Sequence, residues 1–510
     1  MAQRLFGIDG RSLAAFRIGI GSLVLADLWT RSAAIEQHYS DAGVLPRDAY
    51  ARLLAVSPWQ WSVHFVTGSV AGQSALFLFA TVAACALIAG YRTRAATIVT
   101  WAMLVSLQAR NPMVLYGADQ LLRVMLFWSM FLPLGCVWAF DRYKAPSPLA
   151  PSRHVSTATA ALLLQPCVMY LFAGLLKWND SWQSGSALGY ALAAETYATG
   201  IGRMLGRSPA LVAALGRLVP WIEILAPIPL LLPWRTATVR MVTLVLLAGF
   251  HAAMGLSLHT GLFQPVAVVA LIPFLPTGFW ERVGTGHPRT ANAGIPAPAS
   301  TTTRARWFSM VQQTLVGVLF AYVLAWNVVG LSTEQYAAQH NLAWMQEWWR
   351  AGRTGVPLSF RDYAIEREMG NIGWIGRVFA LYQRWDMFES VGPEIRGWPV
   401  IVGTLGDGRK VSVLDERAVD KDAAQVAPAA PLSFYPGARW LVYFTYLRTP
   451  GTKPARELLP AVVTRDWDRR NPGSKLVSMR IAFVTAGDGS TSGKSEVWYD
   501  GMTQGNGLGQ

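Results

Sequence analysis

The segment "YLFAGLLKWNDSW" (Tyr170–Trp182) is an apolar run that stops at a single lysine, Lys177. Together with the apolar residues before it, the run reaches the roughly 20 residues that a helix needs to cross a bilayer. A lysine at the end of such a helix is common at membrane interfaces, because its stem covers apolar surface while its charge reaches water. The segment therefore predicts a transmembrane helix. It leaves open whether Lys177 is an anchor or a reactive amine.

The whole chain has the composition of a membrane protein. Of its 510 residues, 52% are hydrophobic, 22 are tryptophan and only 15% are charged, whereas soluble domains carry about 25% charged residues. The net charge of +14 fits contact with anionic lipid, and no basic run with interleaved aromatics indicates nucleic-acid binding. The three cysteines have the spacing of neither a disulfide framework nor a metal site. We expect membrane lipids as partners, no nucleic acid and no metal.

Apolar windows of span length predict about nine transmembrane helices. They lie near 12–29, 69–90, 95–107, 117–134, 157–176, 210–232, 236–256, 261–279 and 307–330. Arginine and lysine gather in alternate loops, which places those loops and the N-terminus in the cytoplasm. An odd number of spans then carries the C-terminus across the membrane.

Beyond residue 330 the composition changes. "GWPVIVGTLGDGRKVSVL" (397–414) and "ARWLVYFTYLR" (438–448) alternate apolar and polar residues, which predicts strands, and "GDGR" predicts a hairpin turn. We expect a transmembrane domain over 1–280, a cytoplasmic linker over 281–306, a last transmembrane helix over 307–330 and an extracytoplasmic soluble domain over 331–510. The predicted fold is a polytopic α-helical membrane bundle followed by an α+β, strand-rich domain.

Several charged residues lie inside the predicted spans, where a charge costs roughly 2.5–3.5 kcal/mol on insertion scales. Asp119 and Arg123 are spaced i,i+4, which predicts an ion pair on one helix face. Glu223 has no local partner, and we expect it to pair with Arg123 or Arg17 of another helix.

The predicted topology brings polar groups from separate segments to one level at the outer face. Lys177 ends its span there, His251 lies near the outer end of another span, and His259 follows in the outer loop. Residues 111–119 open a further span at the same level. This coincidence of amine, imidazole, amide and carboxylate predicts a functional site.

Ordered segments of the chain resemble one family. They are "FRIGIGSLVLADL", "YSDAGVLPR", "GYRTRAATIVTW", "LQARNPMVLYGADQLLRVMLFWSMFLPLG", "YLFAGLLKWNDSWQSGSAL" and "GFHAAMGLSLHTGLF". These segments, over about residues 10–280, resemble the HTTM family, the membrane region related to vitamin K-dependent γ-glutamyl carboxylase. The resemblance and the short loops imply the inner membrane of a bacterium.

The resemblance implies a quinol-dependent carboxylase or oxygenase, a lyase-like enzyme. Lys177 corresponds to the lysine that deprotonates the reduced quinone, which is vitamin K-like or menaquinol, and desolvation at a helix end suits an amine to that role. His251 resembles a family histidine and completes the expected catalytic pair. The expected substrate-binding residues are Asn111, Tyr116, Asp119, Trp178, Trp182, Glu223 and His259.

The sequence departs from the carboxylase pattern at Pro112, which stands where that enzyme has a catalytic histidine. This departure leaves two classes of function open. One is an enzyme that acts at the outer face on an exported protein or peptide. The alternative is a non-catalytic membrane scaffold or maturation factor for exported proteins. A transporter is disfavoured, because no internal repeat of broken helices is found.

Overall fold

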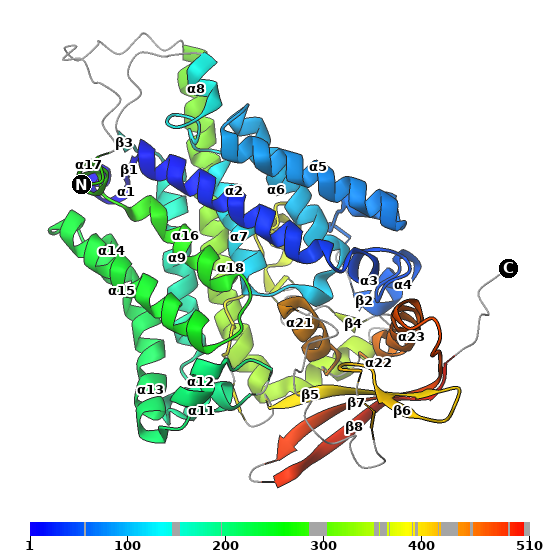
Figure 1. Cartoon of the computed structure of the whole chain (residues 1–510). Helices are drawn as coiled ribbons and strands as arrows, with labels where there is room; N and C mark the ends of the chain where they lie inside the picture. Colours follow the sequence, from blue (N-terminus) through cyan, green and yellow to red (C-terminus); the bar gives the residue numbers. More distant parts are fainter. Residues whose placement is uncertain are drawn as a thin grey trace.

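The computed structural model describes the chain except residues 56–57, 145–152, 195, 285–302, 351–355, 358–364, 367, 390, 393–395, 417, 420–436, 449–451, 488–489 and 504–510. A helical bundle makes up most of it, and a smaller part contains a sheet (Figure 1). One end of the bundle carries the N-terminus, α1 (Ala2–Phe6), the ladder of β1 (Ile8–Asp9) and β3 (Arg153–His154), and α17 (Thr277–Arg282). The sheet lies at the opposite end. Most of the predicted linker over 281–306 lies outside the described residues.

Within the described residues, six helical segments are long and apolar enough to cross a membrane. They are α2 (Gly10–Ser32), α5 (Val70–Ala89), α9 (Thr157–Leu176), the pair α13 (Pro209–Leu225) and α14 (Pro227–Leu231), α15 (Thr236–Ser257), and Arg306–Leu331 within α18 (Thr303–Arg350). These segments match six of the nine predicted spans. The other three predicted spans are α6 (Thr93–Arg110), α7 (Gly117–Ser129) and α16 (Phe263–Leu271), and the count of nine is not confirmed.

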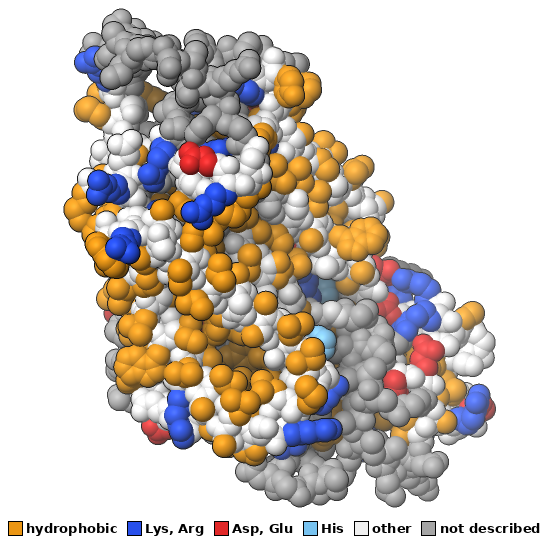
Figure 2. Space-filling model, turned by 60° about the vertical axis from the view of Figure 1, so that its left-hand side comes forward, with side chains coloured by type: hydrophobic (Ala, Val, Ile, Leu, Met, Phe, Trp, Pro, Cys, Tyr) orange, Lys and Arg blue, Asp and Glu red, His pale blue; other side chains and the backbone are white. Residues whose placement is uncertain are grey.

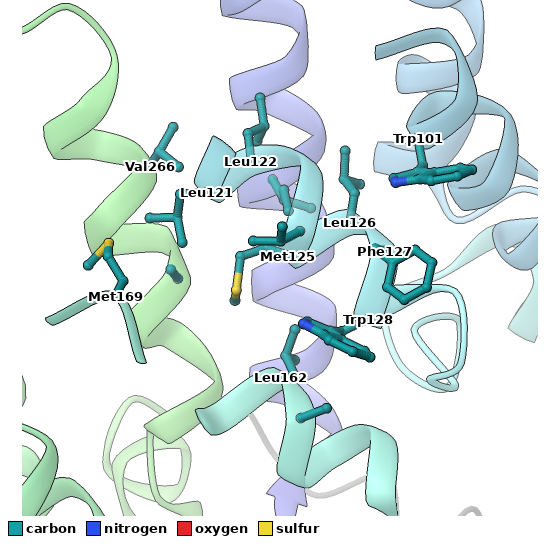
Figure 3. Close-up of a cluster of buried hydrophobic side chains, with 14 of the residues drawn as sticks. Trp101, Leu121, Leu122, Met125, Leu126, Phe127, Trp128, Leu162, Met169 and Val266 are labelled. Atoms are coloured by element: carbon teal, nitrogen blue, oxygen red, sulfur yellow. The ribbon is translucent and has the colours of Figure 1, made fainter. Parts of the chain in front are cut away.

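The length of α7 explains one of these differences. Its 13 residues extend about 20 Å at 1.5 Å per residue, which is short of the roughly 30 Å hydrocarbon core. All of its residues except Gln120 are buried, and Figure 3 shows its apolar side chains between those of α6, α9 and α16. Its side chains are apolar because they are buried in protein. Hydropathy alone does not distinguish burial in protein from burial in lipid.

The outer surface of the bundle is apolar over several helices. Leu78 of α5, Leu218 of α13, Val245 of α15 and Val318 of α18 are each more than half exposed. In Figure 2, where the side of α13 and α15 comes forward, hydrophobic side chains cover most of the bundle's face and surround a hollow. Soluble proteins rarely expose so large a contiguous apolar surface. This surface and the six helices indicate a membrane protein.

The C-terminal part contains a four-stranded antiparallel sheet in the order β6-β5-β7-β8. Its strands are β5 (Gly397–Leu405), β6 (Lys410–Ser412), β7 (Leu476–Gly487) and β8 (Ser490–Met502). The predicted hairpin is present, because β5 and β6 pair across the turn at Gly406–Arg409, with Gly408 at φ +85°. Helices α21 (Ala438–Leu447), α22 (Lys453–Arg456) and α23 (Leu459–Arg470) lie between the sheet and the bundle (Figure 1).

The prediction of a strand over 438–448 is wrong, because this segment is helix α21. Trp440, Tyr443, Phe444 and Leu447 are all buried and follow the i, i+3, i+4, i+7 spacing of one helical face. Aromatic residues also favour strands, so the composition concealed the helical period.

The core beneath the sheet is shared with the bundle. Ile401, Leu405 and Met479 of the sheet belong to one buried cluster with Val44 and Met113, which come from short connecting segments of the bundle. α21 packs against the short helix η2 (Pro112–Val114) of the same bundle region. The C-terminal part is therefore completed by residues from the first quarter of the chain.

Candidate functional site

Lys177 immediately follows the last residue of α9 and is buried, with 4% of its side chain exposed. Its Nζ lies 2.9 and 3.2 Å from the two carboxylate oxygens of Glu223 and donates to the carbonyl of Ala173 at 3.3 Å. The prediction that Glu223 pairs with Arg123 or Arg17 is therefore wrong. A single amine and a single carboxylate, 46 residues apart in sequence, form an isolated buried pair between α9 and α13.

A glycine permits this close pairing. A Cβ atom on Gly174 would lie 2.7 Å from the side chain of Ile224 and 2.9 Å from its backbone nitrogen. Backbone atoms cannot yield to such an approach, so only glycine lets α9 lie this close to α13. Gly174 lies less than one turn before Lys177, and Ile224 is the neighbour of Glu223. The close helix contact and the ion pair thus belong to the same crossing.

The two tryptophans after Lys177 have different environments. Trp182 is 4% exposed, and its ring centre lies 5.9 Å from Lys177 Nζ. Its indole N–H donates to the carbonyl of Phe388 at 2.8 Å. Trp178 is 50% exposed and forms an edge-to-face contact with Trp221 of α13. Trp182 therefore shields the amine, while Trp178 packs against α13 and is half exposed.

His251 forms a second buried cluster. Its Nδ1 lies 2.6 Å from Oε1 of Gln264, and its Nε2 lies 2.6 Å from the Tyr170 hydroxyl. An amide oxygen only accepts, so Nδ1 carries the proton and Nε2 accepts from Tyr170. Tyr170 lies on α9, two helical turns before Lys177, and within the described residues no hydrogen bond joins the two clusters directly. His259 is exposed, and its backbone N–H donates to the carbonyl of Tyr197.

The predicted Asp119–Arg123 pair is wrong. Asp119 binds Arg31 of α2 and Arg439 of α21, with its two oxygens 3.0 and 3.1 Å from the Arg439 guanidinium. Arg123 instead donates to Gln108 and to the backbone of residues 380 and 382. Asp27 completes the cluster, because it binds both Arg31 and Arg439. These four buried side chains, called here the ionic cluster, connect the bundle to the C-terminal part.

Asn111 and Tyr116 have structural partners. The Asn111 amide donates to the carbonyl of His38 at 2.8 Å and accepts from the backbone of Met113. The Tyr116 hydroxyl accepts from the backbone N–H of Leu262 at 3.0 Å. Both residues thus hold backbone segments of the bundle in place, and the structure does not bring either one to Lys177.

A cavity of about 430 Å³ opens at the seam between the bundle and the C-terminal part. Its lining includes His38, Tyr116, Leu262, Arg439 and Trp440. The His38 ring lies 4.4 Å from the Trp440 ring, is 1% exposed, and has no hydrogen-bond partner at either nitrogen. Burial, together with the nearby Arg439 and Arg31, lowers the pKa of His38 to about 3. A neutral imidazole therefore faces this cavity.

The sequence interpretation missed several of these groups. Arg439 lies in a segment that was predicted to be a strand, and Tyr170 and Gln264 are common polar residues within apolar runs. His38 immediately precedes "YSDAGVLPR", which belongs to the family resemblance, so its position was the available signal. The described residues contain no group of three or more His, Cys, Asp or Glu side chains placed to hold a metal ion.

The apolar bundle and its buried ionisable pairs define a polytopic helical membrane protein. The model of the HTTM domain family matches residues 7–279, which is more than half of the chain, and the protein belongs to this family. Comparisons with curated proteins and with solved structures found no match. The HTTM domain is related to vitamin K-dependent carboxylase, and the family predicted from the sequence motifs is confirmed.

Proposed function

We propose that the protein is a quinol-dependent oxygenase or carboxylase-like enzyme in which Lys177 and Glu223 accept the quinol proton. The observation that carries this proposal is the isolated buried pair, with Nζ 2.9 Å from a carboxylate oxygen. The family resemblance assigns the role of base to the lysine at this position. Intramembrane ionisable residues are functional candidates because they are costly to bury.

Glu223 gives the amine a way to become a base. Transfer of one proton from the ammonium to the carboxylate leaves a neutral amine beside a neutral acid, with no change in total charge. A low-dielectric site favours this neutral form, because burying two charges is costly. The free lone pair of Lys177 Nζ then accepts a proton from a hydroxyl that hydrogen-bonds to it.

The surroundings fit a lipophilic quinol. Lys177 and Glu223 lie between α9, which is mostly buried in the bundle, and α13, which is mostly exposed on its apolar outer surface, and 10% of the Glu223 side chain is exposed. The hollow in the apolar face in Figure 2 lies on the side of α13 and α15, which supports access from the bilayer. A bound reduced quinone, vitamin K-like or menaquinol, supplies two electrons for the reduction of oxygen. The chain's part is to accept its hydroxyl proton and to exclude water, chiefly through Trp182.

The seam cavity is our candidate for the second substrate, an exported protein or peptide. Pro112 lacks the imidazole that the carboxylase uses on this substrate, but Asn111 binds the carbonyl of His38 at 2.8 Å. His38 therefore lies beside the same segment, and its neutral imidazole faces the cavity. We propose that His38 contacts the second substrate. In this reading the protein acts at the outer face of a bacterial inner membrane.

The scaffold alternative also has a specific observation in its favour. The side chains of Asn111 and Asp119, both predicted to bind substrate, have structural partners: Asn111 binds backbone groups within the bundle, and Asp119 binds Arg439 of the C-terminal part. A maturation factor would need this rigid seam and no base. The role of Lys177 therefore separates the two functions.

The test is quinol oxidation by the purified full chain in detergent, with menaquinol, ubiquinol and vitamin K hydroquinone each offered with oxygen. Lys177→Arg keeps a cation beside Glu223 but cannot act as a base, because a guanidinium is not deprotonated in proteins. We expect this variant to lose about 100-fold or more in rate. Lys410→Arg, at an exposed position in β6, is the matched control and should keep full activity.

Two results would contradict the proposal that the protein is an enzyme. One is absence of oxidation by the natural chain with all three quinols. The other is an Lys177→Arg rate equal to that of Lys410→Arg. Membrane abundance and melting temperature are measured for each variant, so that loss of folding is not mistaken for loss of the base.

A further inference from the structure

A second cavity lies at the N-terminal end of the bundle, far in sequence from the Lys177 site. Its volume is about 290 Å³. Four arginines line it: Arg4, Arg153, Arg235 and Arg240. They come from α1, β3, the residue before α15, and α15 itself, so the fold brings four separate cations to one space. We call this space the arginine cavity.

The positive charge of the arginine cavity is not neutralised by the described part of the chain. None of the four arginines forms a salt bridge there. The one acidic residue in the lining, Asp9, is bound by Arg11, which donates to it from its backbone at 2.8 Å and from its guanidinium at 3.0 Å. The charges of Asp9 and Arg11 therefore cancel, and the positive charges of the four lining guanidiniums remain unbalanced.

Burial makes this excess charge unusual. Arg240 is only 3% exposed, and its guanidinium donates to the carbonyls of Leu230 and Leu5 at 2.9 and 2.6 Å. Arg153 donates to the carbonyl of Gly7 at 2.9 Å, while its Nε is buried without a partner. Carbonyl groups orient a guanidinium but carry no net charge, so an anion is still needed to balance the site.

The start of α15 adds to the positive potential. Thr236 and Ala237, the first two residues of this 22-residue helix, line the cavity. The first N–H groups of a helix have no partner within it, and they form the positive end of the helix dipole. Phosphate groups commonly bind at such helix starts. Guanidinium groups match phosphate oxygens in geometry as well as in charge.

The surroundings of the cavity indicate that the phosphate belongs to a lipid. Trp234 is 62% exposed beside the cavity, and the Arg235 guanidinium lies 5.1 Å from its ring centre. Ile228 of α14, the helix just before Trp234 in the chain, is 58% exposed. Figure 2 shows basic side chains along the upper margin of the apolar face, at the end that carries the N-terminus in Figure 1. Tryptophan and arginine at the end of lipid-facing helices are typical of the headgroup layer.

We propose that the arginine cavity binds the phosphate headgroup of an anionic phospholipid. The acyl chains of this lipid would lie along the apolar surface of α14 and α15. The site is separate from the proposed quinol chemistry, and neither proposal depends on the other.

The test is lipid retention and thermal stabilisation of the purified full chain. Phosphatidylglycerol is the anionic probe, phosphatidylcholine is the zwitterionic control, and inorganic phosphate is the free anion. The double variant Arg4→Gln/Arg235→Gln removes two exposed cations of the cavity and leaves the buried Arg240 in place. The control is Arg282→Gln, an exposed arginine of α17 at the same end that does not line the cavity.

We expect phosphatidylglycerol to be retained in native mass spectra and to raise the melting temperature more than phosphatidylcholine does. An arginine near the membrane surface contributes about 1 kcal/mol, or about fivefold in affinity. The double variant should therefore bind phosphatidylglycerol about 25-fold more weakly, and Arg282→Gln should bind like the natural chain. Equal retention of the two lipids, an unchanged double variant, or equal stabilisation by inorganic phosphate would each overturn the proposal.

Discussion

Removal of Arg439 should destabilise the seam because it leaves a net charge buried. The ionic cluster contains two carboxylates, Asp27 and Asp119, and two guanidiniums, Arg31 and Arg439, so its formal charge is zero. Arg439→Met leaves two carboxylates with one guanidinium. Breaking a buried ion pair by removing one partner typically costs about 3–5 kcal/mol, and we expect a loss of this size.

A second substitution should recover part of this loss. Adding Asp27→Asn to Arg439→Met leaves one carboxylate and one guanidinium, which restores a formal charge of zero. The recovery is partial, because the double variant still lacks the bond from Arg439 to the carbonyl of Val114 and the contact of its guanidinium with the Tyr116 ring. Asp27→Asn alone leaves a net positive charge and should be destabilising as well. The expected pattern is a double variant more stable than Arg439→Met.

Melting temperatures of the full chain in one detergent measure this cycle. Arg480→Met is the control, because Arg480 is about half exposed and lies 3.8 Å from Asp500 on the sheet surface. An exposed pair contributes at most about 1 kcal/mol. A double variant that melts below both single variants, or an Arg439→Met loss as small as that of Arg480→Met, would contradict a cost of buried net charge at the seam.

Three further results are expected. Gly174→Val should separate α9 from α13 and abolish quinol oxidation, whereas Gly249→Val, at an open position in α15, should be tolerated in the same assay. His38 stays neutral in the folded chain, with a pKa of about 3, while an unfolded histidine titrates near 6.5. The unfolded state therefore binds more protons below pH 6.5, and His38 should cost roughly 2 kcal/mol of stability at pH 5 relative to pH 8. His38→Phe should reduce this acid sensitivity in thermal melts, and an unchanged pH profile would contradict the assignment. Lys177→Met and Glu223→Gln should each destabilise the bundle, and the double variant should melt above both, since it leaves no unpaired charge.

Much of the bundle could be predicted from apolar runs, because an apolar run of span length rarely forms anything other than a transmembrane helix. The runs at α7 and α16 form helices of 13 and 9 residues, and the count of nine is not confirmed, since burial at the centre of a protein selects the same residues as burial in lipid. The partners of the charged residues could not be predicted. Glu223 meets Lys177, and Asp119 meets Arg439 across 320 residues, because of tertiary packing that no local spacing records. The place of His38 in the seam cavity could not be predicted for the same reason.

The family resemblance assigns Lys177 the role of base. Lys177 is buried, and its role stays a prediction. The sequence placed His251, His259 and residues 111–119 at one level, and the structure divides them among separate clusters. The depth of a residue in the membrane is set by the boundaries of its span, whereas its contacts depend on which helix faces turn toward one another. A sequence pattern indicates depth more readily than it indicates contacts.

The shared core beneath the sheet has a consequence for biosynthesis. Val44 and Met113 are synthesised early, yet the strands that share their buried cluster come from residues 397–502. Until the ribosome has synthesised nearly the whole chain, the apolar side chains of these early segments stay uncovered. A chain that terminates before β7 would keep them uncovered permanently, which gives chaperones and proteases a simple feature by which to recognise an incomplete product.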